Sequence, residues 1–466
     1  MNKRVQHVLI VGAGFSGLAA ACELNRRGVR TTICEKQNFC GGLSRTIELE
    51  GLRFELGPHI YFDKDKDVNA YWHSLAGVKM LQYRRSNRIY YNGKYIKSPL
   101  SILDTFLKLG PFVVLKILWS YVTRAFYKMD IASAEDWARV NFGDELYKRF
   151  FKTYNEKIWG IPCSEISANW AGQRIKSSLP TMIFKSVSRD KNFIVKTFQF
   201  PEGGSRSVYD AQVELLNKSS NHEFLLNEEP VLIRRVLEGY QVEFRNSKNE
   251  CQFSHVIWTG HIDRLLEILP GEDDACLTIL KNTASGLKYR NLILLNFVFA
   301  SKDVTNFKEH WIDVHAANIQ ALRVTNFSNY NKASNGASCG VQLEYNCWQS
   351  DKLWTLSDND IREIGLNELK VMTLASFKCQ PQAFSVVRLE RAYPVYFKGY
   401  QERVQKLFDG LDAFPNLVLT GRNGLYKWNN MHHSVKTGIL AARNVLGEKN
   451  DLMALKGLVS FGKESD

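Results

Sequence analysis

The sequence lacks low-complexity tracts and internal repeats, and its composition carries no strong bias. Apolar residues make up 45% of the chain and charged residues 23%, which are ordinary values for a globular protein. This composition argues against disordered, collagen-like and disulfide-stapled proteins. At 466 residues the chain exceeds the size at which one hydrophobic core keeps growing, so we expect two or three structural units.

The sequence also lacks a disulfide pattern. Its nine cysteines are an odd number, they are scattered, and no two form a C-x-x-C pair. Such a pattern favours reduced thiols in a cytoplasm. Only seven residues precede the first apolar run, residues 8–11, which leaves no room for a signal peptide. We therefore expect a cytoplasmic protein, peripheral to a membrane at most.

No apolar run is long enough to span a bilayer. The most apolar stretch covers residues 111–124, opens at Gly110-Pro111, and is punctuated by Lys108, Lys116 and Arg124. It is too short and too charged to cross a membrane. A helix of this kind could lie on a membrane surface, but we favour packing inside a helical domain with the cations reaching solvent.

Acidic residues are in the minority. The chain carries 61 Lys and Arg against 48 Asp and Glu, a net charge of +13. This surplus attracts polyanions such as nucleic acid, anionic lipid or diphosphate ligands, although a solvated basic surface explains it equally well.

The N-terminal segment has the pattern of a dinucleotide cradle. An apolar strand over residues 8–11 enters Gly12-Ala-Gly14-Phe-Ser-Gly17, a helix follows to Arg27, and a second strand ends at Glu35. Gly12 permits the tight turn, Gly14 lets the backbone approach a pyrophosphate, and Gly17 lets the helix pack close to the sheet. The helix N-terminus offers unpaired N–H groups. Glu35 is placed to accept hydrogen bonds from ribose hydroxyls.

The residues after the cradle favour FAD over NAD. A second glycine pair, Gly41-Gly42, follows Glu35 closely, and Gly57-Pro58-His59 comes shortly after it. NAD-binding units normally continue directly into regular βα structure. A second stretch of close backbone contact instead suits a longer cofactor, so we expect FAD.

The rest of the chain alternates between helical and strand-rich segments. Residues 99–192 are largely helical in pattern, residues 224–253 alternate like a meander, and residues 289–400 are mainly strands. We predict an α/β fold: a discontinuous Rossmann-type FAD-binding domain with a helical insertion and an antiparallel-sheet substrate domain. The predicted boundaries are 1–75 with 198–270 and 412–466 for the first unit, 99–197 for the helical one, and 76–98 with 276–400 for the sheet.

Three segments resemble one known family. They are Gly57-Pro-His-Ile-Tyr-Phe62, Tyr154-Asn-Glu-Lys-Ile-Trp-Gly160 and the segment from Gly421 to His433, with Pro201-Glu-Gly-Gly204 between them. Together they resemble the UDP-galactopyranose mutase family, a branch of the amine-oxidase-like flavoproteins. The resemblance runs from Val8 to about Leu446 with the segments in the family's order.

The resemblance implies a set of cofactor contacts. His59 matches the histidine beside the isoalloxazine, and residues 422–431 match the turn whose backbone meets the flavin pyrimidine edge. With the cradle, the implied FAD-binding residues are Gly12, Gly14, Ser16, Gly17, Glu35, Lys36, Gly42, Leu43, Ser44, Gly57, Pro58, His59, Val231, Gly421, Arg422, Asn430 and Met431.

The resemblance also implies a substrate pocket. Arg174 and Arg323 match two arginines that clamp the substrate diphosphate, for which a guanidinium fork is well suited. The implied catalytic residues are His59, Arg174 and Arg323, and the implied substrate-binding residues are Tyr154, Asn155, Trp159, Arg174, Arg323, Tyr393, Tyr426 and Trp428. Trp428 and Asn430 replace a tyrosine and an aspartate of bacterial members, so the floor of the sugar pocket differs.

By resemblance, the expected activity is a pyranose–furanose mutase acting on a nucleotide-diphosphate sugar, in which N5 of the reduced flavin attacks the anomeric carbon. An external reductant such as NADPH or NADH would keep FAD reduced. The alternative is an FAD-dependent oxidoreductase of the amine oxidase or desaturase type, which transfers hydride from an organic substrate to FAD. We expect no nucleic-acid partner. We also expect no metal, because His432 and His433 have no partner at zinc-like spacing.

Overall fold

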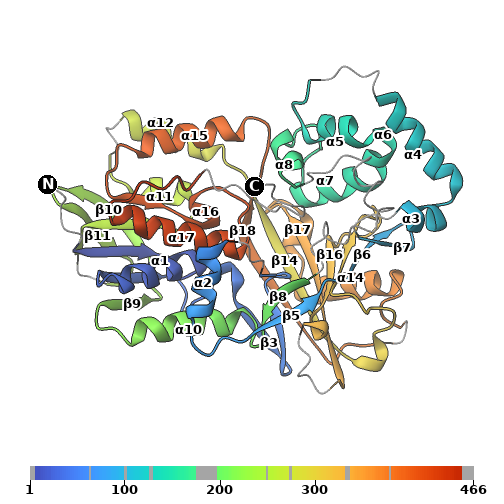
Figure 1. Ribbon diagram of the computed structural model, residues 1–466, viewed down its shortest axis with the longest axis horizontal. Coiled ribbons are helices and arrows are strands. Elements are labelled where there is room, and N and C mark those ends of the chain that lie inside the picture. The colour runs from blue at the N-terminus through green and yellow to red at the C-terminus, as the bar shows by residue number, and fades with distance from the viewer. Residues whose placement is uncertain are drawn as a thin grey trace.

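The first unit is built on a parallel sheet whose strands come from distant parts of the chain. The computed structural model describes residues 6–61, 65–98, 102–124, 130–174, 197–247, 250–271, 275–330, 336–376 and 379–453 (Figure 1). The strand order is β19-β13-β1-β2-β9, with every neighbouring pair parallel. The strands are β1 (His7–Val11), β2 (Arg30–Glu35), β9 (His222–Leu226), β13 (His255–Trp258) and β19 (Leu417–Leu419).

Two helices that are far apart in sequence pack together against this sheet. Gly438 of α17 approaches α1 so closely that an added Cβ would lie 2.2 Å from the Ser16 carbonyl oxygen. This glycine therefore brings the C-terminal helix to the start of the cradle. The helices of this unit are α1 (Phe15–Arg26), α2 (Lys66–Ser74), α10 (Ser205–Asn217), α11 (Ile262–Ile268), α12 (Ala275–Ser285), α15 (Tyr400–Leu411), α16 (Gly421–Gly424) and α17 (Met431–Val445).

The second unit is a seven-stranded sheet in the order β18-β14-β17-β16-β15-β6-β7. Its pairs are antiparallel except β15 with β6. The long strands β14 and β17 bury almost every residue, because α14 covers one face and the first unit lies on the other side (Figure 1). The elements are β6 (Asn87–Tyr91), β7 (Lys94–Lys97), β14 (Tyr289–Ala300), β15 (Trp311–Val314), β16 (Arg323–Asn326), β17 (Ser338–Cys347), α13 (Lys352–Thr355), α14 (Asp358–Val371) and β18 (Ala383–Pro394).

Shorter strands and turns join these units. β3 and β4 form a hairpin, β5 and β8 form an antiparallel pair from distant parts of the chain, and a three-stranded meander joins β10, β11 and β12. These elements are β3 (Thr46–Leu49), β4 (Leu52–Glu55), β5 (Met80–Arg84), β8 (Thr197–Pro201), β10 (Pro230–Val236), β11 (Gly239–Phe244) and β12 (Cys251–Phe253). Single 3₁₀ turns are η1 (Gly42–Ser44), η4 (Ser301–Asp303) and η5 (Phe327–Asn329).

The helical insertion lies at the end of the molecule opposite to β1 and α1 (Figure 1). A π-helical segment, η3 (Tyr147–Lys152), runs directly into α7. The other helices are α3 (Ile102–Leu109), α4 (Pro111–Thr123), α5 (Ala134–Phe142), α6 (Asp144–Leu146), α7 (Thr153–Trp159) and α8 (Ala168–Arg174). In the part of the chain that the structure describes, no helix combines the length and the apolar character needed to cross a membrane.

The predicted fold class is confirmed: a discontinuous Rossmann-type unit carries a helical insertion and a largely antiparallel sheet. One local expectation is corrected. The alternation over residues 224–253 predicted a single meander, but its first strand, β9, pairs in parallel with β2. Parallel and antiparallel edge strands share the same side-chain alternation, so the pattern alone could not separate them.

Candidate functional site: a nucleotide cradle beside an arginine cluster

The glycines of the cradle are required by close approaches of the backbone. Gly12 has a positive φ of 99°, and a Cβ at this position would lie 2.2 Å from the Thr259 hydroxyl oxygen. A Cβ on Gly17 would lie 2.0 Å from the carbonyl oxygen of Gly12. The protein's own atoms therefore leave no room for a side chain at either position. Each glycine allows β1, α1 and β13 to pack closely.

Gly14 differs because its open side faces no protein backbone at close range. A Cβ there would meet only the Gly42 Cα, at 3.9 Å. Gly14 is the N-cap of α1 and, among the described residues, no side chain caps that helix. The Gly41 N–H donates to the Ala13 carbonyl oxygen at 2.9 Å, which holds the second glycine pair beside the first. This open strip of backbone with unsatisfied N–H groups fits a pyrophosphate, so the residues present fit FAD.

The acid at the end of β2 is buried beside the cradle. Glu35 accepts a hydrogen bond from the Ala13 N–H at 2.9 Å and another from the Gln37 N–H at 3.0 Å. The Glu228 N–H donates to the Glu35 carbonyl oxygen at 2.9 Å. That bond brings the start of β10, with the partly exposed Val231, to the same end of the sheet. Lys36 is exposed there. Each Glu35 oxygen keeps a lone pair for a ribose hydroxyl.

The predicted flavin end of the site centres on His59. Gly57 has a positive φ of 96°, and the His59 Nε2 donates to the Leu43 carbonyl oxygen at 3.2 Å. This hydrogen bond links Gly57-Pro58-His59 to η1, which contains Gly42, Leu43 and Ser44. Burial, with the nearby Arg422 charge, lowers the pKa of His59 to about 4. His59 is therefore a neutral imidazole near neutral pH.

Arg422 and two stacked aromatic rings form a wall beside this end. The Arg422 guanidinium donates to the Asn429 carbonyl oxygen at 2.7 Å and lies 5.1 Å from the centre of the Tyr393 ring. Tyr393 stacks on Trp428 with 4.4 Å between ring centroids. Burial lowers the pKa of Arg422. Gly421 sits against Ser16, where an added Cβ would lie 2.5 Å from the Ser16 hydroxyl oxygen.

The start of α17 closes this wall. Asn430 is the N-cap of α17, and its N–H donates to His433 Nδ1 at 3.2 Å. Met431, the next residue, is buried, and its sulfur accepts a hydrogen bond from the Ser205 hydroxyl at 3.8 Å. An asparagine caps a helix as well as an aspartate does, so the start of α17 tolerates Asn430 in place of the aspartate that the resemblance implies for bacterial members.

Arg323 lies in a cluster of polar side chains on three neighbouring strands. Its Nε donates to Asp313 at 3.0 Å, and its two terminal nitrogens lie 3.6 Å from Glu344 and 3.5 Å from the Tyr154 hydroxyl. Tyr154 donates to Asp313 at 3.1 Å, and its ring stacks on His315 with centroids 4.3 Å apart. The Arg323 side chain remains 19% exposed. It is therefore fixed by Asp313 while part of the side chain keeps access to solvent.

The two carboxylates around Arg323 differ in the direction of their pKa shifts. Burial opposes the Arg323 charge, but Glu344 and Asp313 outweigh it and hold the pKa of the guanidinium well above its usual value. Burial alone would raise the pKa of Asp313, yet Arg323 lowers it. Burial raises the pKa of Glu344 despite Arg323. A proton is therefore held more readily by Glu344 than by Asp313.

The other predicted pocket residues are placed differently. Trp159 is fully buried and packs against Trp428, with 5.1 Å between ring centroids. The Asn155 side-chain oxygen accepts a hydrogen bond from the Trp170 indole at 3.1 Å. Tyr426 is also buried, and its hydroxyl lies within hydrogen-bond distance of two backbone carbonyl oxygens, at 2.8 and 2.9 Å. Trp159 therefore contacts the aromatic wall directly and Asn155 contacts it through Trp170, whereas the Tyr426 hydroxyl bonds to backbone. Arg174 ends α8, and its side chain falls outside the described part of the chain.

Asp313, His315 and Glu344 were not predicted from the sequence. Asp313 pairs directly with Arg323 across β15 and β16, and Arg323 pairs with Glu344 across β16 and β17. Residues directly opposite in adjacent strands place their side chains on the same face. The only signal in the sequence is the alternation within each strand, and that signal does not give the register between strands.

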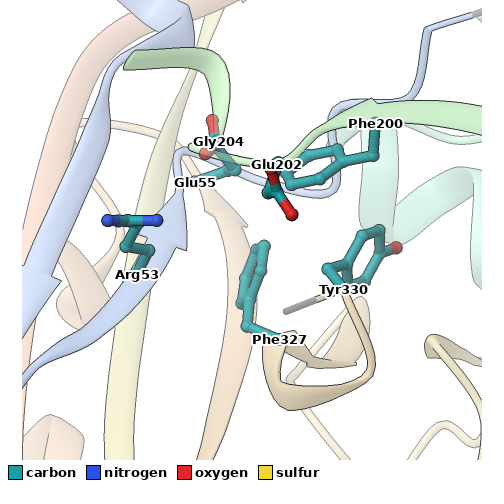
Figure 2. Close-up of a pocket in the computed structure, with 7 residues that line it drawn as sticks. All are labelled: Arg53, Glu55, Phe200, Glu202, Gly204, Phe327 and Tyr330. Carbon is teal, nitrogen blue, oxygen red and sulfur yellow. The ribbon is translucent and has the colours of Figure 1, made fainter. Parts of the chain in front are cut away.

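A small cavity lies near the cluster, between β4, β8 and η5 (Figure 2). It encloses about 10 Å³ and is lined by Arg53, Glu55, Phe200, Glu202, Gly204, Phe327 and Tyr330. The Glu55 Oε2 and the Tyr330 hydroxyl are buried without a hydrogen-bond partner among the described residues. This cavity has room for one water molecule and not for a sugar nucleotide. Within the described ranges, no group of three or more His, Cys, Asp or Glu side chains could hold a metal ion.

Known proteins resemble this chain along most of its length. Residues 15–446 match the family of flavin-containing amine oxidoreductases. The chain is 26% identical to a probable UDP-galactopyranose mutase of Klebsiella pneumoniae over 317 residues, which cover 66% of this chain and 74% of that protein. It is 27% identical to the dTDP-fucopyranose mutase of Escherichia coli over 275 residues, 57% of this chain and 65% of that protein.

The fold has a counterpart among solved structures. The crystal structure of a reduced UDP-galactopyranose mutase superimposes with a TM-score of 0.83 at 22% identity, covering 98% of this chain and 97% of that one. The resemblance that the sequence motifs predicted is therefore confirmed, and the shared fold extends over nearly the whole chain.

Proposed function

The chain belongs to the family of flavin-containing amine oxidoreductases, and within it we propose an FAD-dependent mutase that interconverts the pyranose and furanose forms of a nucleotide-diphosphate sugar. The two relatives named above are mutases of a UDP sugar and a dTDP sugar. Their bases and sugars differ, while the nucleoside diphosphate is common to both. The diphosphate is therefore the part of the substrate that we infer for this chain.

The observation that carries this proposal is the way the Arg323 guanidinium is held by its neighbours. Its Nε is fixed by Asp313 at 3.0 Å, while its terminal nitrogens have longer contacts of 3.5 and 3.6 Å. A guanidinium held in this way presents two N–H groups in a fixed orientation, which suits bidentate binding of a phosphate. A pocket for a purely apolar substrate has no use for a buried guanidinium whose terminal nitrogens are held only by these longer contacts, because burying the charge is costly.

The protein's own residues would bind and orient the substrate. Arg323 would stabilise the charge of the diphosphate as it leaves, and the stacked pair Tyr393 and Trp428 would flank the sugar. Neutral His59 would fix the loop at the flavin end without adding charge. Reduced FAD, when bound along the cradle, supplies the nucleophilic nitrogen N5. No acid–base triad is required.

The proposal is tested by titrating UDP and dTDP against the flavin spectrum of the holoprotein. Arg323→Ala would leave Asp313 and Glu344 without their cation, so we choose Arg323→Lys, which keeps the charge and removes the fork. We expect this variant to keep FAD and to bind UDP at least about tenfold more weakly, about 1.4 kcal/mol. Arg388→Lys is the matched control, because Arg388 lies in the same sheet and pairs with Asp358. A wild type that binds neither nucleotide at millimolar concentration contradicts the proposal.

The alternative is a net oxidoreductase, favoured by the family to which the chain belongs. The redox state in which the flavin must start separates the mutase from the oxidoreductase. A mutase turns over only with reduced flavin, kept so by dithionite, NADPH or NADH, and consumes no stoichiometric reductant. An oxidoreductase bleaches oxidised flavin when its substrate is added. Bleaching by an organic substrate, combined with no response to any sugar nucleotide, would replace the mutase by the oxidoreductase.

A further inference from the structure

The apolar helix that the sequence singled out presents its hydrophobic side to solvent. The sequence predicted packing within a helical domain, but Ile117 is the one residue of α4 that is buried. Phe112 is 80% exposed and Trp119 is 72% exposed. They belong to one row, spaced three or four residues apart on the helix, formed by Phe112, Leu115, Trp119 and Val122. Residues at this spacing share one face of a helix.

The opposite face fixes α4 to the rest of the protein. Arg124 donates to the Val140 carbonyl oxygen at 2.9 Å and to the Tyr121 carbonyl oxygen at 2.7 Å. The Ser120 hydroxyl accepts a hydrogen bond from the Glu145 N–H at 3.0 Å. Two of the three cations that interrupt the sequence pattern are therefore turned toward the protein, because Lys108 also donates to the Tyr95 carbonyl oxygen. The apolar row is held outward by polar contacts on the other side.

The neighbouring helix extends the same surface. Phe106 and Leu107 of α3 are exposed, and α3 joins α4 at Gly110, whose positive φ of 87° allows the sharp turn before Pro111. Seven of the fourteen large exposed apolar side chains recorded for the described chain lie on these two helices: Phe106, Leu107, Phe112, Leu115, Leu118, Trp119 and Val122. A concentration of this kind marks an interaction surface. We call it the α3–α4 face.

Exposed lysines flank the α3–α4 face. Residues 94–124 contain five cations and one carboxylate, Asp104, which pairs with Lys108. Lys116 is exposed on α4, and Lys94 and Lys97 are exposed on the adjoining strand β7. An apolar row with flanking cations and a tryptophan is typical of helices that lie in the interface of an anionic bilayer. Two copies of the face would instead bring like charges together.

We propose that the α3–α4 face docks the protein on the surface of an anionic lipid bilayer. The 13-residue α4 lies in the interface and does not span it. Phe112, Leu115, Trp119 and Val122 enter the boundary between headgroups and acyl chains, and Lys116 contacts lipid phosphates. The face lies at the outer edge of the helical insertion, so docking leaves the cradle and the arginine cluster free for their ligands (Figure 1). This inference is independent of the proposed reaction.

The test is co-sedimentation of the FAD-loaded protein with phosphatidylcholine vesicles made with or without phosphatidylglycerol. We expect pelleting with the anionic vesicles at physiological salt and at least about tenfold weaker binding to the zwitterionic ones. Phe112→Asp with Trp119→Asp should reduce binding to anionic vesicles by at least about tenfold while FAD content and melting temperature stay unchanged. The control is Ile279→Asp, which alters an exposed apolar residue on α12. Lys116→Glu should weaken only the anionic component.

Three outcomes overturn the proposal. The wild type could remain in the supernatant with both kinds of vesicle. The double variant could pellet as well as the wild type. Size-exclusion chromatography with light scattering could also show an oligomer that the double variant converts to monomers, which would assign the face to a second copy of the chain. None of these outcomes depends on UDP binding, so they leave the proposed function untouched.

Discussion

The cradle and the arginine cluster are built from the chain in opposite ways. The cradle consists mainly of backbone within residues 8–42, and its specificity lies in where side chains are missing, at Gly12, Gly14 and Gly17. The cluster consists of side chains brought together from β15, β16, β17 and α7, which are separated by up to about 190 residues. A cofactor held by backbone can be identified from a short motif. A substrate held by assembled side chains cannot.

The largest expected effect is the loss of FAD when a side chain is added to the backbone of the cradle. Gly14→Val places a side chain in the open strip where a pyrophosphate would touch backbone, so we expect a folded, colourless protein with less than about a tenth of the normal FAD. Gly17→Ala instead drives a Cβ into the Gly12 carbonyl oxygen, which should destabilise the fold by about 1–3 kcal/mol. Flavin absorbance and urea unfolding measure the two effects. A yellow Gly14→Val protein would show that this strip does not hold the cofactor.

The next effect concerns the single acidic side chain that the cradle contributes. Glu35→Ala removes an acceptor for the ribose hydroxyls as well as for the Ala13 and Gln37 N–H groups. We expect FAD affinity to fall by about 1.5–3 kcal/mol, the range for a hydrogen bond to a charged group. Equilibrium dialysis of FAD against apoprotein measures it, with Glu238→Ala, an exposed glutamate in the turn between β10 and β11, as control. Equal affinities for wild type and Glu35→Ala would remove Glu35 from the cofactor site.

The same contrast explains how much could be predicted from the sequence. The strand-turn-helix at Gly12 and the helix start at Gly110-Pro111 were predictable because each depends on local backbone preferences. Asp313 and Glu344 were missed because they meet Arg323 only through strand register. Helix periodicity in residues 111–124 predicted a helix correctly but could not say which neighbour, if any, covers its apolar face.

At the arginine cluster we expect the free energy of unfolding to depend on pH through a buried histidine. Burial lowers the pKa of His315, which stacks on Tyr154, to about 4 from 6.5. Between these values the unfolded chain binds a proton at this residue and the folded chain does not, so the free energy of unfolding decreases as the pH falls. His315→Phe keeps an aromatic ring and removes this proton. We expect it to reduce the loss of stability between about pH 7 and about pH 5 by about 1–2 kcal/mol.

Urea unfolding at the two pH values tests this prediction. His73→Phe is the control, because His73 is an exposed residue of α2. If His315→Phe loses as much stability as the wild type while His73→Phe does not differ from either, the pH dependence does not originate in the ring that supports Tyr154.

The smallest expected effect is a change in the preference between sugars, without a change in the affinity for the nucleotide. Trp428 stacks on Tyr393, contacts Trp159 edge-on and contacts Trp170 at a tilt. Its backbone N–H donates to the Tyr396 hydroxyl at 2.8 Å, and this hydrogen bond fixes the position of the backbone. We therefore expect Trp428→Tyr to alter mainly the ring that, in the proposed function, flanks the sugar. Loss of part of an aromatic stack costs about 0.5–1.5 kcal/mol, so we expect the ratio of kcat/KM for two UDP sugars to shift by about two- to tenfold. UDP affinity, which we assign to Arg323, should remain unchanged. Trp354→Tyr, in α13 on the far side of the sheet core, is the control. A change in UDP affinity without a change in the sugar ratio would mean that Trp428 supports the diphosphate site and that the sugar is recognised elsewhere.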